Sequence, residues 1–282
     1  MGQALEKPIE KELKSGSNLE RVLASGHFAV TGELGPPRSM NLDLINRKIT
    51  YLKGFVDAAN LTDNQTGIVR LSSIATSILC HQGGLEPVMQ MTCRDRNRLA
   101  MQSDLLGANI HGVKNVLCLS GDHQSFGDHP GTKNVHDIDS MQLIRMVSEM
   151  RDKNQFQNGV EIKGGGPKMF IGAAASPFSS PVEMRPLRLA KKVLAGADFT
   201  QTQMIFDMEK FKIYMRRIVD MGLHEKISIL AGVGPLKSAP MARFLHEKIP
   251  GIEVPEHLIE RMENAVKDID KEDKEARQEA GR

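Results

Sequence analysis

The chain has 282 residues, of which 40% are apolar and 26% charged, as in ordinary globular proteins. Its formal net charge of +2 shows no strong excess of one sign, which argues against nucleic acid or a membrane surface as a partner. No apolar run approaches the roughly 20 residues that a membrane span needs. The polar residues 1–17 lack the apolar stretch of a secretory signal. The three cysteines form no CxxC pair and are expected to be free thiols, so we expect a cytoplasmic protein.

Apolar stretches of strand length recur along the chain, and several are nearly continuous, as in strands covered on both faces. They are residues 27–34, 55–62, 87–92, 115–120, 169–175, 199–206 and 227–233. Segments of helical pattern lie between or after them, at residues 41–53, 72–81, 95–106 (closed by Gly107), 139–153, 181–194, 208–221 and 238–248. This alternation predicts an α/β fold with a parallel sheet, a (β/α)8 TIM barrel whose eighth strand is not evident in this chain.

A doubly wound sheet remains the alternative, but no GxGxxG fingerprint follows a strand. The three glycines at 164–166 precede the fifth strand and are interpreted as a loop. We expect one barrel domain over residues 1–282, with an N-terminal extension at 1–25 and a charged C-terminal helix at 255–282. The end of that helix is polar on all faces, which is typical of a solvated helix rather than a binding tail.

Active sites of such barrels lie at the C-terminal ends of the strands. Glu33 ends the first strand and is followed by a stiff Gly-Pro-Pro turn, and Asp122 follows the fourth strand. Two carboxylates in different surroundings can take different protonation states, which suits acid–base work. The alternative is that Glu33 caps the turn and that Asp122 caps a helix. Other strand-end residues are Thr62, Asn64, Gln90, Ser120, Gly121, Ala174 and Ala175.

Gln201 and Gln203 lie two residues apart on the sixth strand and are expected to share a face. Two inward amides need hydrogen-bond partners, which a heterocyclic ligand would supply. After the fifth strand, Arg188 and Lys192 lie on one helical stripe with Arg185, and Ser180 is expected at the helix start, where anions are favoured. That group would suit a phosphate-bearing ligand; a solvated helix face is the alternative.

The long loop at residues 123–137 holds three histidines, His123, His129 and His136. Their spacings of six and seven match no common metal-ligand pattern, so no metal site is predicted. A mobile lid or a ligand-contact loop is the favoured interpretation.

Several strand-end motifs together resemble the methylenetetrahydrofolate reductase family. They are GELGPPR at 32–38, MTC at 91–93, LSGD at 119–122, GAAASP at 172–177, KKVLAGADFTQTQMIFD at 191–207 and AGVGPL at 231–236. Each is weak alone, but their order and spacing over residues 27–250 are specific. The resemblance implies a β8α8 barrel that uses a flavin, FAD or alternatively FMN, to reduce 5,10-methylenetetrahydrofolate to 5-methyltetrahydrofolate.

The same resemblance assigns roles to residues. Glu33 matches the family's general acid, and Asp122 matches the aspartate near the flavin and the pterin. Gln203 matches a folate-contacting glutamine, with Gln201 and Phe206 in the same segment. Matching or neighbouring the flavin-contacting positions are Thr62, Asn64, Gln90, Ser120, Gly121, Ala174, Ala175, Ser180, Arg188 and Lys192.

Three departures from the family pattern surround the flavin positions. Gln90 stands where many members have histidine, Ser176 where they have tyrosine, and residues 62–65 read TDNQ. The runs GELGPPR at 32–38 and LTDNQ at 61–65 resemble those of anaerobic, acetogen-type reductases. That resemblance implies a reduced nicotinamide or a partner electron-transfer subunit as donor, and an oligomer or hetero-complex. Two alternatives are a flavin-carrying subunit that needs a partner for activity and a flavin barrel oxidoreductase acting on a different imine.

Overall fold

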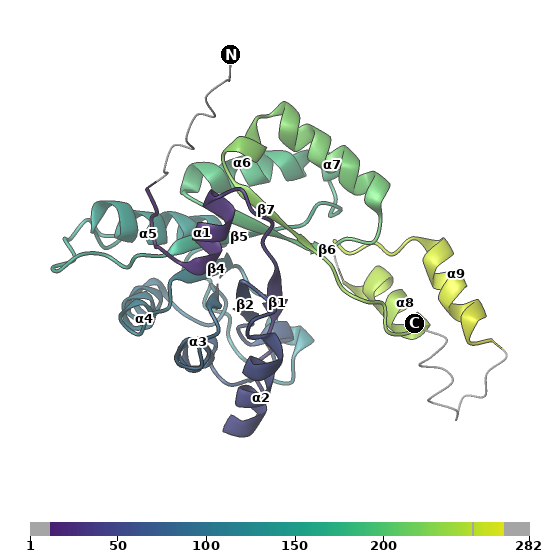
Figure 1. Cartoon of the computed structure of the whole chain (residues 1–282), viewed down its shortest axis with the longest axis horizontal. Helices are drawn as coiled ribbons and strands as arrows, with labels where there is room; N and C mark the ends of the chain where they lie inside the picture. The colour runs from purple at the N-terminus through teal and green to yellow at the C-terminus, as the bar shows by residue number, and fades with distance from the viewer. Residues whose placement is uncertain (1–11, 250, 268–282) are drawn as a thin grey trace, which may run out of the picture. The chain divides into compact units, whose positions relative to one another are not determined.

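The computed structural model describes residues 12–249 and 251–267 (Figure 1). Its strands are β1 Thr31–Glu33, β2 Ala58–Leu61, β3 Pro87–Thr92, β4 Asn115–Leu119, β5 Phe170–Ala175, β6 Phe199–Met204 and β7 Ser228–Gly232. Its α-helices are α1 Asn18–Ala24, α2 Leu42–Leu52, α3 Ser73–Gln82, α4 Arg98–Ile110, α5 Ser140–Lys153, α6 Arg185–Ala195, α7 Met208–Asp220, α8 Ala239–Lys248 and α9 Glu256–Ala265. Short 3₁₀ helices are η1 Gln65–Gly67, η2 Gln124–Phe126, η3 Val182–Met184 and η4 Leu223–Glu225.

The strands form one sheet in the order β1 to β7, and the registered pairs are parallel. A doubly wound sheet reverses its strand order at a switch point, whereas this order runs on without reversal, as it does in a barrel. The predicted α/β class with a parallel sheet is therefore confirmed. Within the described residues no eighth strand follows β7.

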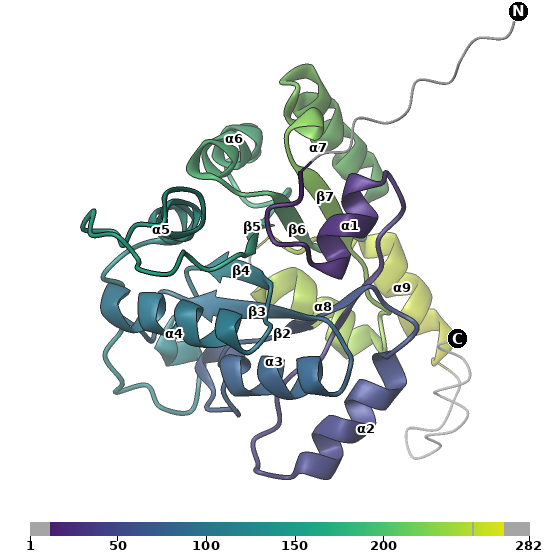
Figure 2. The same cartoon turned by 60° about the vertical axis from the view of Figure 1, so that its left-hand side comes forward.

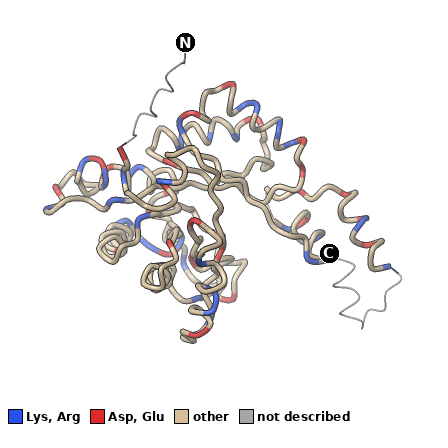
Figure 3. Tube along the Cα trace, viewed as in Figure 1, with Lys and Arg blue, Asp and Glu red and all other residues tan. Residues whose placement is uncertain are grey.

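The chain divides into two compact units between Gly172 and Ala173, and each is described by itself. The single-domain organisation stays a prediction. In the first unit, α3 and α4 lie side by side against the strands (Figures 1 and 2). Acidic and basic residues are interspersed along both units (Figure 3). In the part of the chain that is described, no helix is long and apolar enough to cross a membrane.

In the core of the first unit, apolar residues at helical spacing pack against the sheet. Ile45 and Ile49 lie four residues apart on α2, and both are buried against Ala59 and Leu61 of β2. Residues four apart share one helix face, so α2 lies along the sheet with its polar face outward. In the second unit, a separate cluster joins α8 and α9, including Ala242, Leu245, Ile252, Val254 and Ile259.

Several predicted helix starts are confirmed as N-caps. Asn41, Ser72, Asp139 and Ser238 each accept a backbone N–H bond from the first turn of the helix that follows. The predicted helix at 255–282 begins after Pro255 as α9, and residues 268–282 lie outside the described residues.

The predicted boundaries of two helices are wrong. The helix predicted at 95–106 begins at Arg98, because the Asn97 side chain caps it, and it passes through Gly107 to Ile110. Ala108 is fully buried, so packing outweighs the cost of about 1 kcal/mol for a helical glycine. The helix predicted from 181 begins only at Arg185, after the 3₁₀ turn η3.

Residues 14–24 belong to the predicted N-terminal extension, and hydrogen bonds to the buried side chain of Glu20 hold the start of this segment. The carboxylate of Glu20 accepts hydrogen bonds from the backbone N–H of Lys14, Ser15 and Gly16 at 2.7, 2.8 and 2.9 Å, and from Ser15 Oγ at 2.7 Å. Burial alone would raise the pKa of Glu20, but these bonds outweigh it and the pKa is lowered.

Replacing Glu20 by glutamine is expected to destabilise the protein at neutral pH by about 1–3 kcal/mol, because buried N–H donors lose a charged acceptor. A lowered folded-state pKa gives stability that is present above the unfolded-state pKa and is lost as pH falls through the folded-state pKa. The difference between wild type and Glu20→Gln in urea unfolding should therefore shrink in acid. Glu12→Gln, at an exposed neighbouring site, is the control; an equal difference at both pH values would contradict this assignment.

Candidate active site

Glu33 ends β1, and the turn after it is held by two basic side chains. Lys48 of α2 donates from Nζ to Gly35 O at 2.7 Å. Arg70 donates from NH1 to Pro36 O at 3.3 Å. These bonds, together with the fixed φ of the prolines, restrain the turn that the sequence predicted to be stiff. The turn that directly follows Glu33 is therefore held by one bond from α2 and one from the segment after β2.

The carboxyl of Glu33 reaches solvent, yet the surrounding chain removes enough water from it to change its ionisation. This desolvation raises the pKa of Glu33, and the positive charge of Lys48 opposes the shift without cancelling it. A strand-end acid with a raised pKa keeps its proton to higher pH, which is what a general acid requires.

Asp63, directly after β2, is a buried carboxylate that joins several elements. Arg96 donates to its two oxygens from NH1 and NH2 at 2.7 and 3.3 Å. Thr92 donates to Oδ2 from its backbone N at 2.9 Å and from Oγ1 at 3.0 Å, and Ser73 Oγ donates to Oδ1 at 3.3 Å. Asp63 is 3% exposed. Its hydrogen bonds connect the end of β2 to the end of β3 and to α3.

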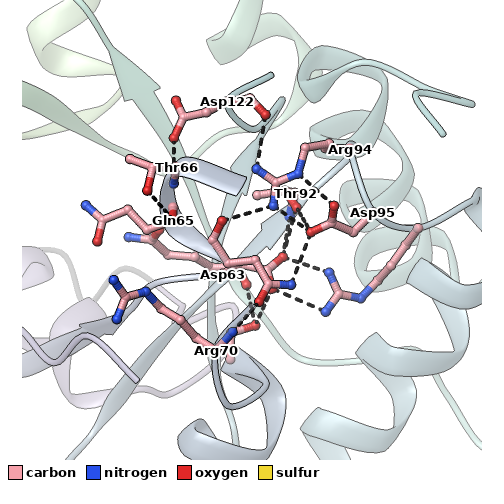
Figure 4. A network of polar contacts seen from close by, with 12 residues as sticks. Asp63, Gln65, Thr66, Arg70, Thr92, Arg94, Asp95 and Asp122 are labelled. Carbon is pink, nitrogen blue, oxygen red and sulfur yellow. Dashed lines mark hydrogen bonds and ion pairs between the residues drawn. The ribbon is translucent and has the colours of Figure 1, made fainter. Parts of the chain in front are cut away.

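Arg94 and Asp122 belong to the same network of polar contacts (Figure 4). Arg94 forms a two-pronged ion pair with Asp95 and also donates to Asn64 O and Asp122 O, each at 3.0 Å. The carboxylate oxygen Oδ2 of Asp122 accepts from Thr66 N at 3.0 Å. The ends of β2, β3 and β4 are therefore connected through one buried guanidinium.

The other predicted flavin-contacting residues of this unit differ in how well their polar groups are satisfied. Thr62 is buried, and its Oγ1 has no hydrogen-bond partner within the described residues. Gln90 is half-buried, with its backbone O accepting from Ser73 Oγ at 2.8 Å. Asn64 Oδ1 accepts from Arg70 N at 3.0 Å. The hydroxyl of Thr62 is thus the group that a bound ligand would satisfy.

The turn after β4 depends on a glycine. Gly121 has φ +89°, and a Cβ there would lie 3.0 Å from Arg94 Cβ and 3.1 Å from Thr92 Cβ. Only glycine fits both the conformation and the space. Ser120 is exposed and donates to Ser140 Oγ at 3.2 Å, which links this turn to the start of α5.

In the second unit, Lys192 of α6 donates from Nζ to the backbone oxygen of Ala174. Ala175 is buried, and Ala174 is half-buried at the end of β5. The structure thus brings Lys192 to one of the two predicted alanine positions, Ala174. Arg188, by contrast, is exposed on the same helix.

The prediction that Ser180 lies at the start of α6 is wrong. The helix begins at Arg185, because the chain first makes the 3₁₀ turn η3. The guanidinium of Arg185 donates instead to the backbone oxygens of Ser179, at 2.6 Å, and Ser180. Arg185 therefore fixes this segment and is not part of a free basic stripe.

On β6, a register shift lies between Gln201 and Met204, so strict alternation does not connect Gln201 with Gln203. Gln201 is half-buried, and its Nε2 has no hydrogen-bond partner among the described residues, whereas Gln203 is exposed. Phe206 packs against the cluster of α8 and α9. The three predicted folate-contacting residues thus lie in three different surroundings within this unit.

The histidines of the 123–137 loop do not gather with one another. His123 Nδ1 accepts from Ser125 N at 3.3 Å, and His129 contacts Asp128 at 2.9 Å. His136 donates from its backbone N to Cys93 O at 3.1 Å. Within the described chain, no group of three potential metal ligands forms. The second anchor of the loop is Val135 N, which donates to Arg94 O at 2.8 Å.

Sequence reasoning named the strand-end segments but missed the charged residues that organise them. Asp63 was one of four residues in a strand-end run, and the arginines at 94 and 96 received no role. One signal was available: the run RDR at 94–96 follows a nearly continuous apolar strand after a single cysteine, and arginines next to buried chain usually have charged partners.

Comparison with known proteins places the chain in a family. The family model described as Methylenetetrahydrofolate reductase matches residues 18–281. A probable methylenetetrahydrofolate reductase (NADPH) of Caenorhabditis elegans is 25% identical over 267 residues, which are 89% of this chain and 37% of that protein. Methylenetetrahydrofolate reductase 2 of Schizosaccharomyces pombe is 28% identical, covering 88% and 39%. The 5,10-methylenetetrahydrofolate reductase of Salmonella typhimurium is 24% identical, covering 77% and 68%.

Solved structures support the fold. An uncharacterised protein from Clostridium thermocellum that binds two copies of 5-methyl-5,6,7,8-tetrahydrofolic acid superposes with a TM-score of 0.58 at 14% identity, covering 88% of this chain and 80% of that one. A 2,3-dimethylmalate lyase gives 0.51 at 12% identity, covering 78% of each chain. These likenesses confirm the predicted barrel class. Because the family model matches almost the whole length, the chain belongs to the methylenetetrahydrofolate reductase family.

Proposed function

We propose that the chain catalyses the flavin-dependent reduction of 5,10-methylenetetrahydrofolate to 5-methyltetrahydrofolate. Family membership supports the substrate and the reaction class, although the chain spans 37% and 39% of the lengths of two of the relatives it matches. The observation that carries the proposal is Glu33, a desolvated acid with a raised pKa at the C-terminal end of β1. The folate bound by the structural neighbour from Clostridium thermocellum is compatible with the same substrate class.

The residues present fit a flavin by a physical criterion. Thr62 Oγ1 in the first unit is buried without a partner within the described residues, and burying such a group unpaired costs free energy. A flavin, with ring nitrogens and carbonyl oxygens, would satisfy groups of this kind, and it supplies the hydride when bound. We propose FAD, with FMN as the alternative. The proposed contacts are Thr62, Asn64, Gln90, Ser120, Gly121, Ala174, Ala175, Ser180, Arg188 and Lys192.

The two carboxylates would divide the work. Glu33 would donate a proton to a ring nitrogen of the folate, which opens its five-membered ring and makes the methylene carbon electrophilic. The carboxylate of Asp122 would stabilise the positive charge that develops on the folate. Gln203, with Gln201 and Phe206, would contact the folate.

The decisive experiment begins with the purified full chain. Its visible spectrum and the mass of the released cofactor are expected to show a flavin and to distinguish FAD from FMN. After anaerobic reduction with dithionite, methylenetetrahydrofolate should reoxidise the flavin and yield methyltetrahydrofolate. A colourless protein that takes up neither flavin would refute the proposal, and reoxidation by another imine alone would reassign the substrate.

The same preparation identifies the electron donor. The name of the relative from Caenorhabditis elegans specifies NADPH, and that of a relative from Arabidopsis thaliana specifies NADH. For this chain we propose a reduced nicotinamide or a partner electron-transfer subunit as the electron donor. Reduction by NADH or NADPH alone would establish a direct nicotinamide donor. Reduction by dithionite but by neither nicotinamide would favour a partner subunit, within an oligomer or hetero-complex.

A further inference from the structure

Arg94 is a buried cation whose hydrogen bonds go to three different segments. Its side chain is 3% exposed. Two of its nitrogens donate to the carboxylate of Asp95, each at 2.7 Å. The guanidinium also donates to two backbone oxygens at the neighbouring strand ends, from NH2 to Asn64 O after β2 and from NH1 to Asp122 O after β4. A planar guanidinium can make such divergent bonds at once, whereas a lysine ammonium presents a single point.

The charge of this guanidinium is balanced close by. Burial alone would raise the pKa of Asp95, but hydrogen bonds from Arg94 and Asn64, together with the nearby positive charges, lower it. Asp95 is therefore ionised at neutral pH and neutralises Arg94. Arg94 therefore holds the strand ends in place through its hydrogen bonds and adds little net positive charge to them.

The two loops that Arg94 joins also touch each other. Thr66 N donates to Asp122 Oδ2 at 3.0 Å. A Cβ at Gly127 would lie 2.0 Å from Gly67 O, so the loop after β4 lies directly on the loop after β2. Asn64 and Thr66 have φ of +43° and +59°, a left-handed conformation that non-glycine residues keep only where the surroundings hold it.

We propose that Arg94 is a positioning residue that fixes Asp122 for the reaction by bracing the loops after β2 and β4 against each other. With the brace in place, the Thr66 amide holds one oxygen of Asp122, and Oδ1 accepts no bond from the described residues and stays available to a ligand. The inference rests on the proposed function for its catalytic part. The brace itself is a property of the free protein.

The test combines Arg94→Lys, Asp122→Asn and the double variant. In flavin-loaded protein, Arg94→Lys is expected to slow reoxidation by methylenetetrahydrofolate about 10- to 100-fold, as expected for a displaced catalytic group. In the Asp122→Asn background the same change should cause little further loss, because both substitutions act on one group. Multiplied losses in the double variant would overturn the inference. Arg98→Lys, at an exposed and similarly two-pronged pair with Asp137, is the matched control and should leave the rate unchanged.

A second readout needs no activity. Amide hydrogen exchange at Thr66 should be slow in wild type and clearly faster in Arg94→Lys; unchanged protection would overturn the brace. If Arg94→Lys does not fold, Asp95→Asn loosens the same guanidinium and should also speed exchange at Thr66. A wild type that binds no flavin refutes the proposed function and the catalytic part of the inference, whereas the exchange measurement still decides whether Arg94 braces the loops.

Discussion

Replacing Glu33 by glutamine is expected to lower methylenetetrahydrofolate reduction about 10²- to 10⁴-fold while flavin binding and flavin reduction persist. Glutamine keeps the size and the hydrogen-bonding capacity of the side chain but has no acidic proton to transfer, and general acid catalysis contributes about this factor. Anaerobic stopped-flow measurement of flavin reoxidation, with dithionite as the reductant, separates the folate step from the step that reduces the flavin.

The pH dependence follows from the raised pKa of Glu33. The acid is active when protonated, so the rate of the folate step should fall as pH rises through this pKa, which desolvation places above the ordinary value for glutamate. The charge of Lys48 favours the ionised form, and Lys48→Met should therefore raise the pKa of Glu33 and move the decline to higher pH. In Glu33→Gln the decline should disappear.

The controls distinguish an acid from a packing residue. Asp43→Asn, an exposed change in the first turn of α2, should leave the rate and its pH profile as in wild type. Equal reoxidation rates in Glu33→Gln and wild type would remove Glu33 from the proposed chemistry. A Glu33→Gln protein without flavin would show that the residue supports cofactor binding instead.

Local features of the sequence predicted much of the fold. The strand at 87–92 agrees with β3 at both ends, and the caps Asn41, Ser72, Asp139 and Ser238 begin the expected helices. These features depend on residues within one turn or one strand, so neighbours along the chain determine them. Where packing competes with propensity, as at Gly107 inside α4, the local prediction was wrong.

The candidate site was less accessible because its organisation is non-local. Asp63 binds Arg96 across 33 positions, and Thr66 binds Asp122 across 56. No periodicity indicates which of several strand-end carboxylates is paired and which is free. The rule that strand ends converge pointed to the segments after β2, β3 and β4, but it could not show that Arg94 joins all three.

The register shift in β6 is another feature that local sequence patterns did not predict. Gln201 and Gln203 were assigned one face because strands alternate. The extra residue between Gln201 and Met204 interrupts that alternation, and nothing in the run FTQTQM announces it. Burial of the unpaired Gln201 amide is a feature that only the folded chain shows.

Replacing Asp63 by alanine is expected to destabilise the protein by about 3–5 kcal/mol, the loss found when one partner of a buried ion pair is removed. Among the described residues, Arg96, with 16% of its side chain exposed, would keep only its ion pair with Asp104, and the backbone N–H of Thr92 would lose its acceptor. A typical domain has about 5–15 kcal/mol of stability in total. Urea unfolding followed by circular dichroism should show the midpoint moving to much lower denaturant.

The matched control is Asp104→Asn, which removes the other carboxylate that contacts Arg96. Asp104 has 32% of its side chain exposed, and ion pairs at such sites contribute about 0–1 kcal/mol, so its loss should be small. Adding Arg96→Met to Asp63→Ala should recover part of the loss, because the uncompensated buried charge disappears with the arginine. If the two aspartate variants are equally stable, burial does not set the strength of this pair, and Asp63 is not what joins the ends of β2 and β3.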